Sequence, residues 1–298
     1  MKKILSFTLK LIAVKCAVLG AMAVYNSLVF RAAARLDRRH KHGARTYKWR
    51  YGKISYIKKG AGDPLLLVHG VGVGADHTEW ERNIEELAGE HTVYAPDLLG
   101  FGRSDKPDAE YSAYLYTTLI NDFIYEVIGA QTNIIASGGG AAFAVMAHLF
   151  KPQYYKKLLL VSPEGLRGAA DAPGNLHVWV KWLLSMPVFG TFIYNVMSSR
   201  ANMPRERFIS AHIGGSGARL PLAAFVSRFL HVSIVRPLED VNVPLCVAWG
   251  GGDEPGDECF TVEKANPAAR LVVFEGAKKQ PHREQSGAFN KLCLEFFD

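Results

Sequence analysis

Six short apolar runs constrain the fold of this 298-residue chain more than any other feature. The runs cover residues 65–69, 92–96, 133–136, 157–162, 245–250 and 271–275. Each has the length of a strand, and the first four are each followed by a helical segment. Strands that alternate with helices form parallel sheets covered on both faces. We therefore expect an α/β fold with a mostly parallel central sheet.

Other segments complete this domain. Polar and apolar residues alternate over residues 47–51 and 53–58, which predicts an antiparallel hairpin at its start. Over residues 165–243 the alternation of strands and helices stops, and apolar helical patches predict a helical insertion over one edge of the sheet. Apolar residues repeat at helical spacing over residues 286–297, which predicts the last helix. Residues 47–298 are therefore assigned to one α/β domain.

The N-terminal segment, residues 1–46, contains an apolar stretch from residue 11 to residue 30 that only Lys15 and Asn26 interrupt. Twenty helical residues reach about 30 Å, the thickness of the hydrocarbon core of a bilayer. The stretch therefore predicts a single membrane-spanning anchor. A cleaved signal peptide is the alternative, because Ala21-Met22-Ala23 resembles a cleavage site, and the domain would then be secreted.

Positive charge gathers beside this apolar stretch. The formal net charge is +7, and residues 31–53 hold nine Lys or Arg against one Asp, while the first 30 residues hold four Lys. The remainder carries 22 basic and 27 acidic residues, so the charge does not favour nucleic acid as a partner. Basic residues crowd the C-terminal side of the anchor and, by the positive-inside rule, place the domain in the cytoplasm. They are Arg31, Arg35, Arg38, Arg39, Lys41 and Arg45.

The four cysteines and ten histidines show no spacing typical of metal ligands. Cys246 falls in an apolar run and Cys293 on the apolar face of the last helix, as buried free thiols do. The glycine run at residues 138–140 lacks the Lys-Ser/Thr that follows a phosphate-binding loop. We expect no metal, nucleotide or other cofactor.

Three motifs lie in order along the domain. Residues 65–70 combine an apolar strand with a His-Gly turn, residues 94–107 contain Asp-Leu-Leu-Gly-Phe-Gly-Arg-Ser, and residues 281–289 lead into the last helix. With these motifs the chain resembles the α/β-hydrolase family, in particular its esterase and epoxide-hydrolase-like branch, over residues 48–298. The resemblance implies an α/β-hydrolase fold in which residues 165–243 form a helical cap. It also implies a nucleophile on a sharp strand-to-helix turn, a histidine base, a carboxylate and two backbone donors for an oxyanion.

At the strand-to-helix turn, residues 134–141 read Ile-Ile-Ala-Ser-Gly-Gly-Gly-Ala. In the family, small residues flank the nucleophile and a proline follows it after fourteen positions. Counting back from Pro152 places Gly138 in the nucleophile slot, where glycine has no side chain to attack a substrate. The alternative nucleophile is Ser137, but that register puts the bulky Ile135 where a small residue belongs.

The segment before the last helix departs from the family in a similar way. Family members read Gly-His-x-Pro-x-x-Glu, and residues 278–284 read Lys-Lys-Gln-Pro-His-Arg-Glu. Pro281 and Glu284 set the register, so Lys279 stands in the slot of the base. His282 is the alternative base, although a surface or capping histidine is the simpler interpretation at the start of a helix.

The other expected parts of the site are present. Trp249-Gly250-Gly251-Gly252-Asp253 resembles the family's Trp-Gly-x-x-Asp, which makes Asp253 the acid. Glu164 lies near an alternative acid position, or is an ordinary loop carboxylate. The backbone N–H groups of Val71 and Gly139 are the expected oxyanion donors, and they do not depend on side-chain identity.

Two functions are compatible with these residues, and a structural role at the membrane, in which the pocket is incidental, is a third possibility. The first is a membrane-anchored hydrolase-fold protein without an intact Ser-His-Asp triad, which binds a lipophilic small molecule or a protein partner. The second is an active esterase or lipase that acts on a small lipophilic ester, with Ser137 and His282 in a shifted geometry. In the first case we expect little hydrolysis, because joint loss of nucleophile and base removes roughly 10⁶-fold in rate.

Overall fold

The computed structural model describes residues 2–37, 43–166, 175–200, 205–212, 215–253 and 256–298. Its centre is an eight-stranded sheet with the order β1-β2-β4-β3-β5-β6-β7-β8. The strands are β1 (Arg45–Trp49), β2 (Gly52–Lys59), β3 (Asp63–Val68), β4 (His91–Pro96), β5 (Thr132–Ser137), β6 (Tyr155–Val161), β7 (Leu245–Gly250) and β8 (Arg270–Phe274). All six apolar runs and the hairpin predicted from the sequence are strands.

The sheet is antiparallel at one edge and parallel elsewhere. The hairpin strand β2 pairs antiparallel with both β1 and β4. From β4 through β8 the neighbouring strands are parallel. The predicted mostly parallel sheet is confirmed, and the carboxyl ends of its parallel strands meet at one edge.

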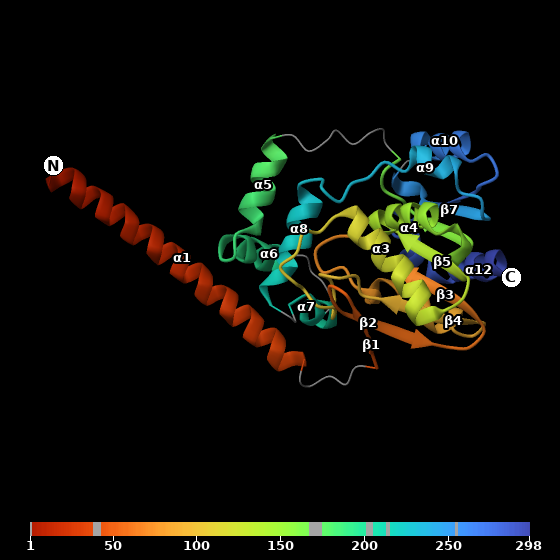
Figure 1. Cartoon of the computed structure of the whole chain (residues 1–298), viewed down its shortest axis with the longest axis horizontal. Helices are drawn as coiled ribbons and strands as arrows, with labels where there is room; N and C mark the ends of the chain where they lie inside the picture. Colours follow the sequence, from red (N-terminus) through yellow and green to blue (C-terminus); the bar gives the residue numbers. More distant parts are fainter. Residues whose placement is uncertain (1, 38–42, 167–174, 201–204, 213–214, 254–255) are drawn as a thin grey trace.

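Helices pack on both faces of this sheet, and others lie at one end of it (Figure 1). They are α1 (Lys2–Asp37), α2 (Ile84–Leu87), α3 (Ala113–Phe123), α4 (Gly138–Phe150), α5 (Asn175–Ser185), α6 (Phe189–Arg200), α7 (Arg205–His212), α8 (Arg219–Val226), α9 (Val235–Glu239), α10 (Gly256–Ala265), α11 (Pro281–Glu284) and α12 (Ser286–Phe297). α5 to α9 lie between β6 and β7, in the stretch predicted as a helical insertion, and we call α5 to α8 the cap.

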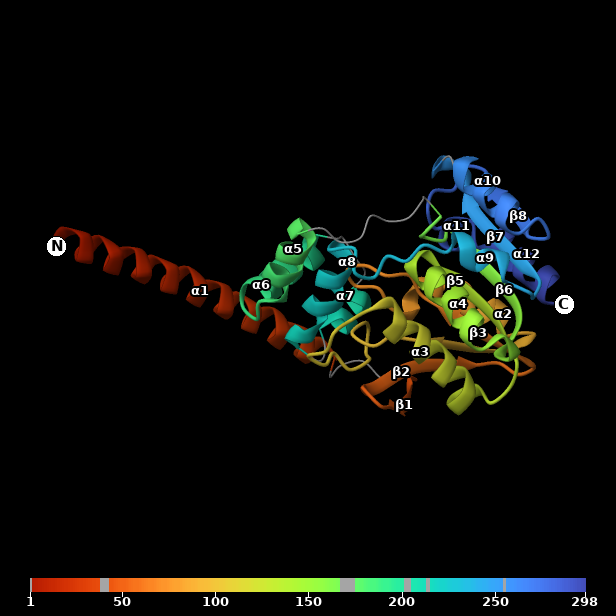
Figure 2. The same ribbon diagram turned by 45° about the horizontal axis from the view of Figure 1, so that its top comes forward.

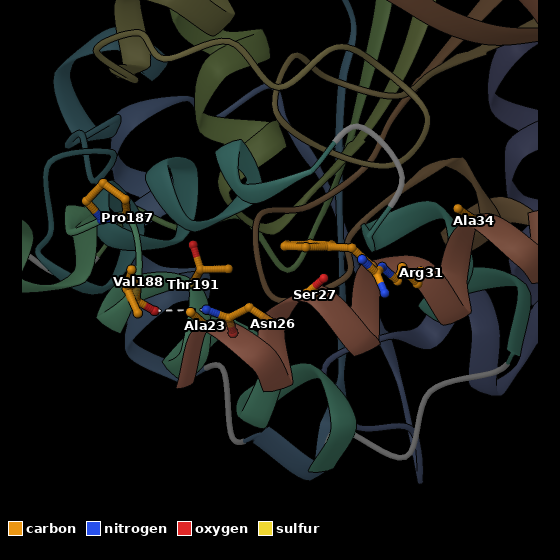
Figure 3. A pocket seen from close by; sticks show the side chains of 9 residues that line it. Ala23, Asn26, Ser27, Arg31, Ala34, Pro187, Val188 and Thr191 are labelled. Atoms are coloured by element: carbon orange, nitrogen blue, oxygen red, sulfur yellow. Dashed lines mark hydrogen bonds between the residues drawn. The ribbon is translucent and has the colours of Figure 1, made fainter. Parts of the chain in front are cut away.

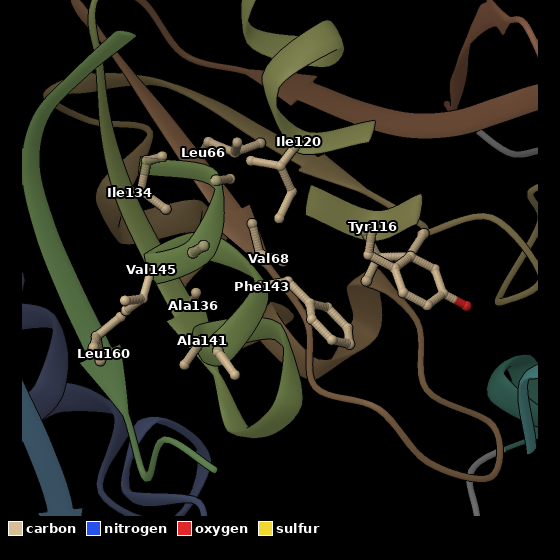
Figure 4. Packing of buried hydrophobic residues seen from close by; sticks show 14 of the residues in the cluster. Leu66, Val68, Tyr116, Ile120, Ile134, Ala136, Ala141, Phe143, Val145 and Leu160 are labelled. Atoms are coloured by element: carbon tan, nitrogen blue, oxygen red, sulfur yellow. The ribbon is translucent and has the colours of Figure 1, made fainter. Parts of the chain in front are cut away.

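Side chains of the parallel strands alternate between the two faces of the sheet, as the two-residue period of a strand requires. Leu66 of β3 belongs to the cluster that packs with Tyr116 of α3 and Phe143 of α4 (Figure 4). The neighbouring Leu67 belongs to the opposite cluster, with Phe289 of α12. Because both faces are buried, these strands are apolar at nearly every position.

Helix α1 has 36 residues and is about 54 Å long. Its segment Ser6–Leu36 is long and apolar enough to cross a membrane. The N-terminal half projects away from the rest of the chain, whereas the C-terminal half lies against the cap (Figures 1 and 2). Of the predicted juxtamembrane cations, Arg38, Arg39 and Lys41 lie outside the described residues.

Candidate functional site

The turn from β5 into α4 forms the tip of the candidate site. Ser137 ends the strand in an extended conformation, with φ −116° and ψ 152°. Gly138 follows with φ +50°, in the left-handed region. A side chain in this region is strained by about 1–2 kcal/mol. A sharp turn from strand to helix of this kind raises the residue at its tip above its neighbours. The structure therefore puts Gly138 at the tip and Ser137 on the strand before it.

The glycines of this turn differ in the room around them. A Cβ at Gly140 would lie 2.3 Å from the carbonyl oxygen of His69, so the two backbones touch and glycine is required. A Cβ at Gly138 would meet nothing nearer than 3.9 Å. The tip of the turn can therefore accept a side chain that its neighbour cannot.

The two predicted oxyanion donors lie next to each other. A Cβ at Gly139 would come within 3.1 Å of Val71 Cγ2, so these residues are in contact across the turn. Gly139 belongs to the first turn of α4, where helix N–H groups carry partial positive charge. This end of α4 suits an anion or a polarised carbonyl.

A buried carboxylate that the sequence analysis missed lies under the turn. The Ser137 hydroxyl donates a hydrogen bond to Glu79, and the Gly70 N–H donates to Glu79 Oε2 at 3.0 Å. His282 Nε2 lies 3.3 Å from Glu79 Oε1, and both side chains are almost fully buried. Burial alone raises the pKa of Glu79, but the His282 interaction and the Ser137 hydroxyl outweigh burial and bring it to about 2. The order of contact is thus serine–carboxylate–histidine, with the carboxylate in the middle.

The expectation of a surface or capping position for His282 is wrong. Its side chain is fully buried, with the ring 4.5 Å from that of Trp80 between centroids. The Asn83 amide donates to the His282 carbonyl at 2.9 Å and to Asn290 Oδ1 at 2.7 Å. The hydrogen bonds from Asn83 hold α11 and α12 against the start of α2. The His282 side chain of α11 therefore points into the protein.

A second buried acid, Asp97, holds the loop that follows the His-Gly turn through hydrogen bonds. Asp97 Oδ1 accepts hydrogen bonds from the His77 N–H and lies 2.8 Å from His77 Nδ1, and Oδ2 accepts from the Arg103 N–H. Burial lowers the pKa of His77, but the charge of Asp97 and its hydrogen bond outweigh this and raise it to about 9. The pair links the motif at residues 94–107 to the loop that carries Val71.

Glu164 lies directly beside the tip of the turn. Its Oε1 is 3.9 Å from the Cβ position of Gly138, and its Oε2 is 3.5 Å from that of Gly139. The Glu164 N–H donates to the Gly138 carbonyl at 3.1 Å. Ser162, two residues earlier, has φ +41°, a strained conformation that turns the chain toward α4. A carboxylate of the chain itself therefore stands at the N-terminus of α4, beside the slot of the nucleophile.

Two basic residues, His231 and Lys279, lie near Glu164, and His231 was not foreseen. His231 Nε2 is 3.9 Å from Glu164 Oε2, because the Ile234 N–H donates to the Gly165 carbonyl and brings this segment alongside. Burial raises the pKa of Glu164, and the charge of Lys279 offsets part of this rise. Lys279, which stands in the slot of the base, is therefore close enough to act on this carboxyl.

The loops of Lys279 and Asp253 pack together at the carboxyl ends of β7 and β8. The Gly252 N–H donates to the Ala277 carbonyl at 2.8 Å, and a Cβ at Gly250 would lie 1.7 Å from the Lys278 carbonyl oxygen. Asp253 ends the turn η5 (Gly251–Asp253), but its side chain lies outside the described part of the structure. The structure thus brings the two loops together.

The described part of the chain holds no cluster of metal ligands at this site. Among the residues that the structure describes, no group of three or more His, Cys, Asp or Glu side chains could hold a metal ion. Cys246 and Cys293 are buried free thiols, whereas Cys16 is exposed on α1. The groups that the described residues bring to the site are carboxyl, imidazole, ammonium and hydroxyl groups.

Comparisons with known proteins identify the family of this chain. A family model described as "Alpha/beta hydrolase family" matches residues 65–289. An uncharacterized protein of Mycobacterium tuberculosis is 36% identical over 270 residues, which cover 80% of this chain and 76% of the relative. Lipase 1 of Psychrobacter immobilis is 36% identical over 130 residues, or 42% of this chain and 39% of the lipase.

A solved structure extends the likeness to the whole chain. The crystal structure of a membrane phospholipase A, described as a bacterial virulence factor, superposes with a TM-score of 0.67 at 19% identity. The superposition covers 100% of this chain and 98% of the other. At this identity the likeness concerns the fold alone.

Proposed function

The chain belongs to the α/β hydrolase family, and from this premise we propose that it is a membrane-anchored member without a working Ser-His-Asp triad. In this proposal the site binds a lipophilic small molecule or a protein partner without hydrolysing it. One observation carries the proposal: Gly138 occupies the left-handed tip of the turn, where the family holds its nucleophile. Glycine supplies no atom that could form a covalent intermediate.

The slot of the base supports the same proposal. Lys279 is exposed and stands where the family has histidine. A lysine ammonium has three donors and no acceptor, so it cannot take a proton from a nucleophile. It can instead attract a negatively charged ligand, or the neighbouring Glu164.

The second candidate function is an esterase or lipase that acts on a small lipophilic ester. The closeness of Ser137 and His282 to the same oxygen of Glu79 favours it. In this arrangement, however, the serine hydroxyl donates to a carboxylate whose pKa is about 2. A general base works best with a pKa near the operating pH, so Glu79 would take that proton poorly.

The lipophilic character of the ligand rests on two observations. The relatives include Lipase 1 and the mouse (Lyso)-N-acylphosphatidylethanolamine lipase, whose names describe lipid substrates. The second observation is α1, which we propose crosses a bilayer through residues 11–30. From the basic residues that follow α1 we propose that the domain lies on the cytoplasmic side, with secretion after cleavage as the alternative. Digestion of intact cells with an external protease tests the side, because a cytoplasmic domain stays intact.

Glu164 gives the proposed site a specific ligand chemistry. The carboxyl group stands beside Val71 and Gly139, where a ligand carbonyl would accept the two backbone hydrogen bonds. Burial raises the pKa of Glu164, and in its protonated form the carboxyl group can donate a hydrogen bond to a carbonyl or carboxylate. A fatty acid or ester carbonyl can therefore bind here with no nucleophile to attack it.

A fluorophosphonate probe on the full chain in detergent distinguishes the two functions. The proposal expects labelling no stronger than that of the Ser137→Ala variant. Labelling of the natural chain that disappears in Ser137→Ala would refute the proposal and establish the esterase. Circular dichroism and a thermal melt of both proteins control for unfolding.

A further inference from the structure

Helix α5 carries its apolar side chains on the outside. Leu176, Trp179 and Trp182 are 73%, 65% and 56% exposed. Lys181, in contrast, turns toward the protein, with its Nζ 4.0 Å from the ring centroid of Phe229 and 3.1 Å from a carboxylate oxygen of Glu110. This is the reverse of a surface helix in water, which turns its charges outward and its apolar stripe to the core.

Helix α1 meets the cap along one face of its C-terminal half. From Ser6 to Ala21 the helix is exposed on all sides, whereas from Met22 onward buried and half-buried residues recur every three or four positions. These residues are Met22, Tyr25, Asn26, Val29, Phe30, Ala33 and Leu36. α1 therefore rests against the cap over its last four turns.

Asn26 shows how close this contact is. Its amide donates to the Val188 carbonyl at 3.0 Å, and the Asn195 amide donates to Asn26 Oδ1 at 2.9 Å. The ring of Tyr25 packs edge-on against Phe192, with centroids 5.4 Å apart. The cap thus supplies the hydrogen bonds that a polar side chain needs inside an otherwise apolar stretch.

The rise per residue of α1 gives the depth of this contact in the membrane. If residues 11–30 cross the hydrocarbon layer, Asn26 lies four residues inside its boundary, or about 6 Å. The turn between α5 and α6, which includes Val188, then lies at the same depth. Amphipathic helices that lie in the interface are buried by about 5–10 Å, which agrees with this position.

A groove between α1 and the cap lies at the same level. It has a volume of about 500 Å³ and is lined largely by apolar side chains such as Phe30, Pro187 and Val188, with Arg31 beside them (Figure 3). An acyl chain fits such a lining, and a guanidinium one residue past the boundary can pair with a lipid phosphate. Both features favour lipid over a protein partner at this surface.

We propose that α5 and the turn at Pro187–Val188 lie in the interfacial layer of the bilayer that α1 crosses, as a second membrane contact of the chain. The proposal rests on the membrane anchoring of α1 and goes beyond it. α5 and α6 lie at the end of the domain from which α1 projects (Figures 1 and 2). Trp179 and Trp182, with ring centroids 5.6 Å apart, occupy the headgroup level where tryptophans are enriched.

Tryptophan quenching in the full chain tests this contact. Trp179 and Trp182 are exposed, whereas Trp49, Trp80 and Trp249 are buried. In nanodiscs, lipids brominated near the glycerol end of the acyl chain should quench up to two fifths of the emission, and iodide in the water should quench little. Lipids brominated near the chain terminus should quench less. The matched variant Trp179→Phe/Trp182→Phe keeps the apolar surface and should lose the lipid quenching.

Three other outcomes overturn the proposal. Iodide quenching without lipid quenching would place α5 in water. Quenching by neither agent would show that protein covers the helix. A full chain that does not float with vesicles would refute the anchor and this contact together, whereas a floating chain without lipid quenching would refute this contact alone. None of these outcomes depends on the probe labelling that tests the triad.

Discussion

Placing a serine at Gly138 and a histidine at Lys279 should convert the site into a hydrolase. Gly138 already has the conformation of a raised nucleophile, with φ +50°. A Cβ there would meet no atom nearer than 3.9 Å, so the serine needs no repacking. The left-handed conformation costs a side chain about 1–2 kcal/mol, a loss that a folded domain of this size tolerates.

The expected gain follows from what a positioned base contributes. Gly138→Ser/Lys279→His should hydrolyse a p-nitrophenyl ester at least about 10²-fold faster than its control, the lower end of the effect of general base catalysis. The charge of Lys279 already acts on Glu164, whose Oε1 lies beside the Gly138 position. We therefore expect a histidine at 279 to reach the new hydroxyl, and fluorophosphonate labelling should appear with the activity.

The matched control is Gly138→Ala/Lys279→His. It carries the same backbone strain and the same histidine, and it lacks only the hydroxyl. A serine variant that is folded, by circular dichroism, yet is labelled no more than this control would refute the register that places Gly138 and Lys279 in the catalytic slots. A further comparison with Ser137→Ala in the same background shows which serine carries the probe.

Three further predictions concern the groups that support the site. Glu79, with its pKa lowered from 4.5 to about 2, should add on the order of 3 kcal/mol of stability that is present above pH 4.5 and lost as the pH falls toward 2. Thermal melts of Glu79→Gln should lack this acid dependence. His77, with its pKa raised from 6.5 to about 9, should stabilise the fold fully below pH 6.5 and lose this effect as the pH rises through 9. Melts of His77→Asn should show a smaller loss of stability over that range, and an equal slope in both proteins would contradict the assignment. Gly140→Ala should destabilise the domain by several kcal/mol, because its Cβ would lie 2.3 Å from a backbone oxygen, whereas Gly72→Ala, with nothing within 4 Å, should have little effect in the same melt.

The sheet could be predicted from the sequence because its strands are buried on both faces. β3, with Leu66 in one apolar cluster and Leu67 in the other, must be apolar at consecutive positions. The antiparallel pairing of β2 with β4 could not be predicted in the same way. Pairing depends on contacts between distant segments, and local pattern does not record them.

For the candidate site, too, local patterns could be predicted and contacts between distant segments could not. The positions of Gly138 and Lys279 came from counts along the chain, because each lies within fifteen residues of a proline that sets the register. Glu79 and His231 were missed, because they reach the site from segments 58 residues before Ser137 and 67 residues after Glu164.

The contacts of Glu79 with Ser137, Gly70 and His282 favour a ligand-binding role for the site. The interaction of Glu79 with His282 offsets the cost of burying the charge of Glu79, and well-packed apolar residues of the same volume often stabilise a fold as well or better. This carboxylate nevertheless contacts Ser137 below the tip, the Gly70 N–H of the oxyanion loop and His282 on the far side. Its contacts join the three segments that surround the turn at Gly138, so its role is to hold their relative positions. Such positioning has value for a site that binds a ligand, and it has none for a fold that serves only as a membrane-bound scaffold. Titration of the full chain with a fluorescent fatty acid should therefore show binding that Glu79→Gln weakens, and equal binding by both proteins would leave the cluster without this role.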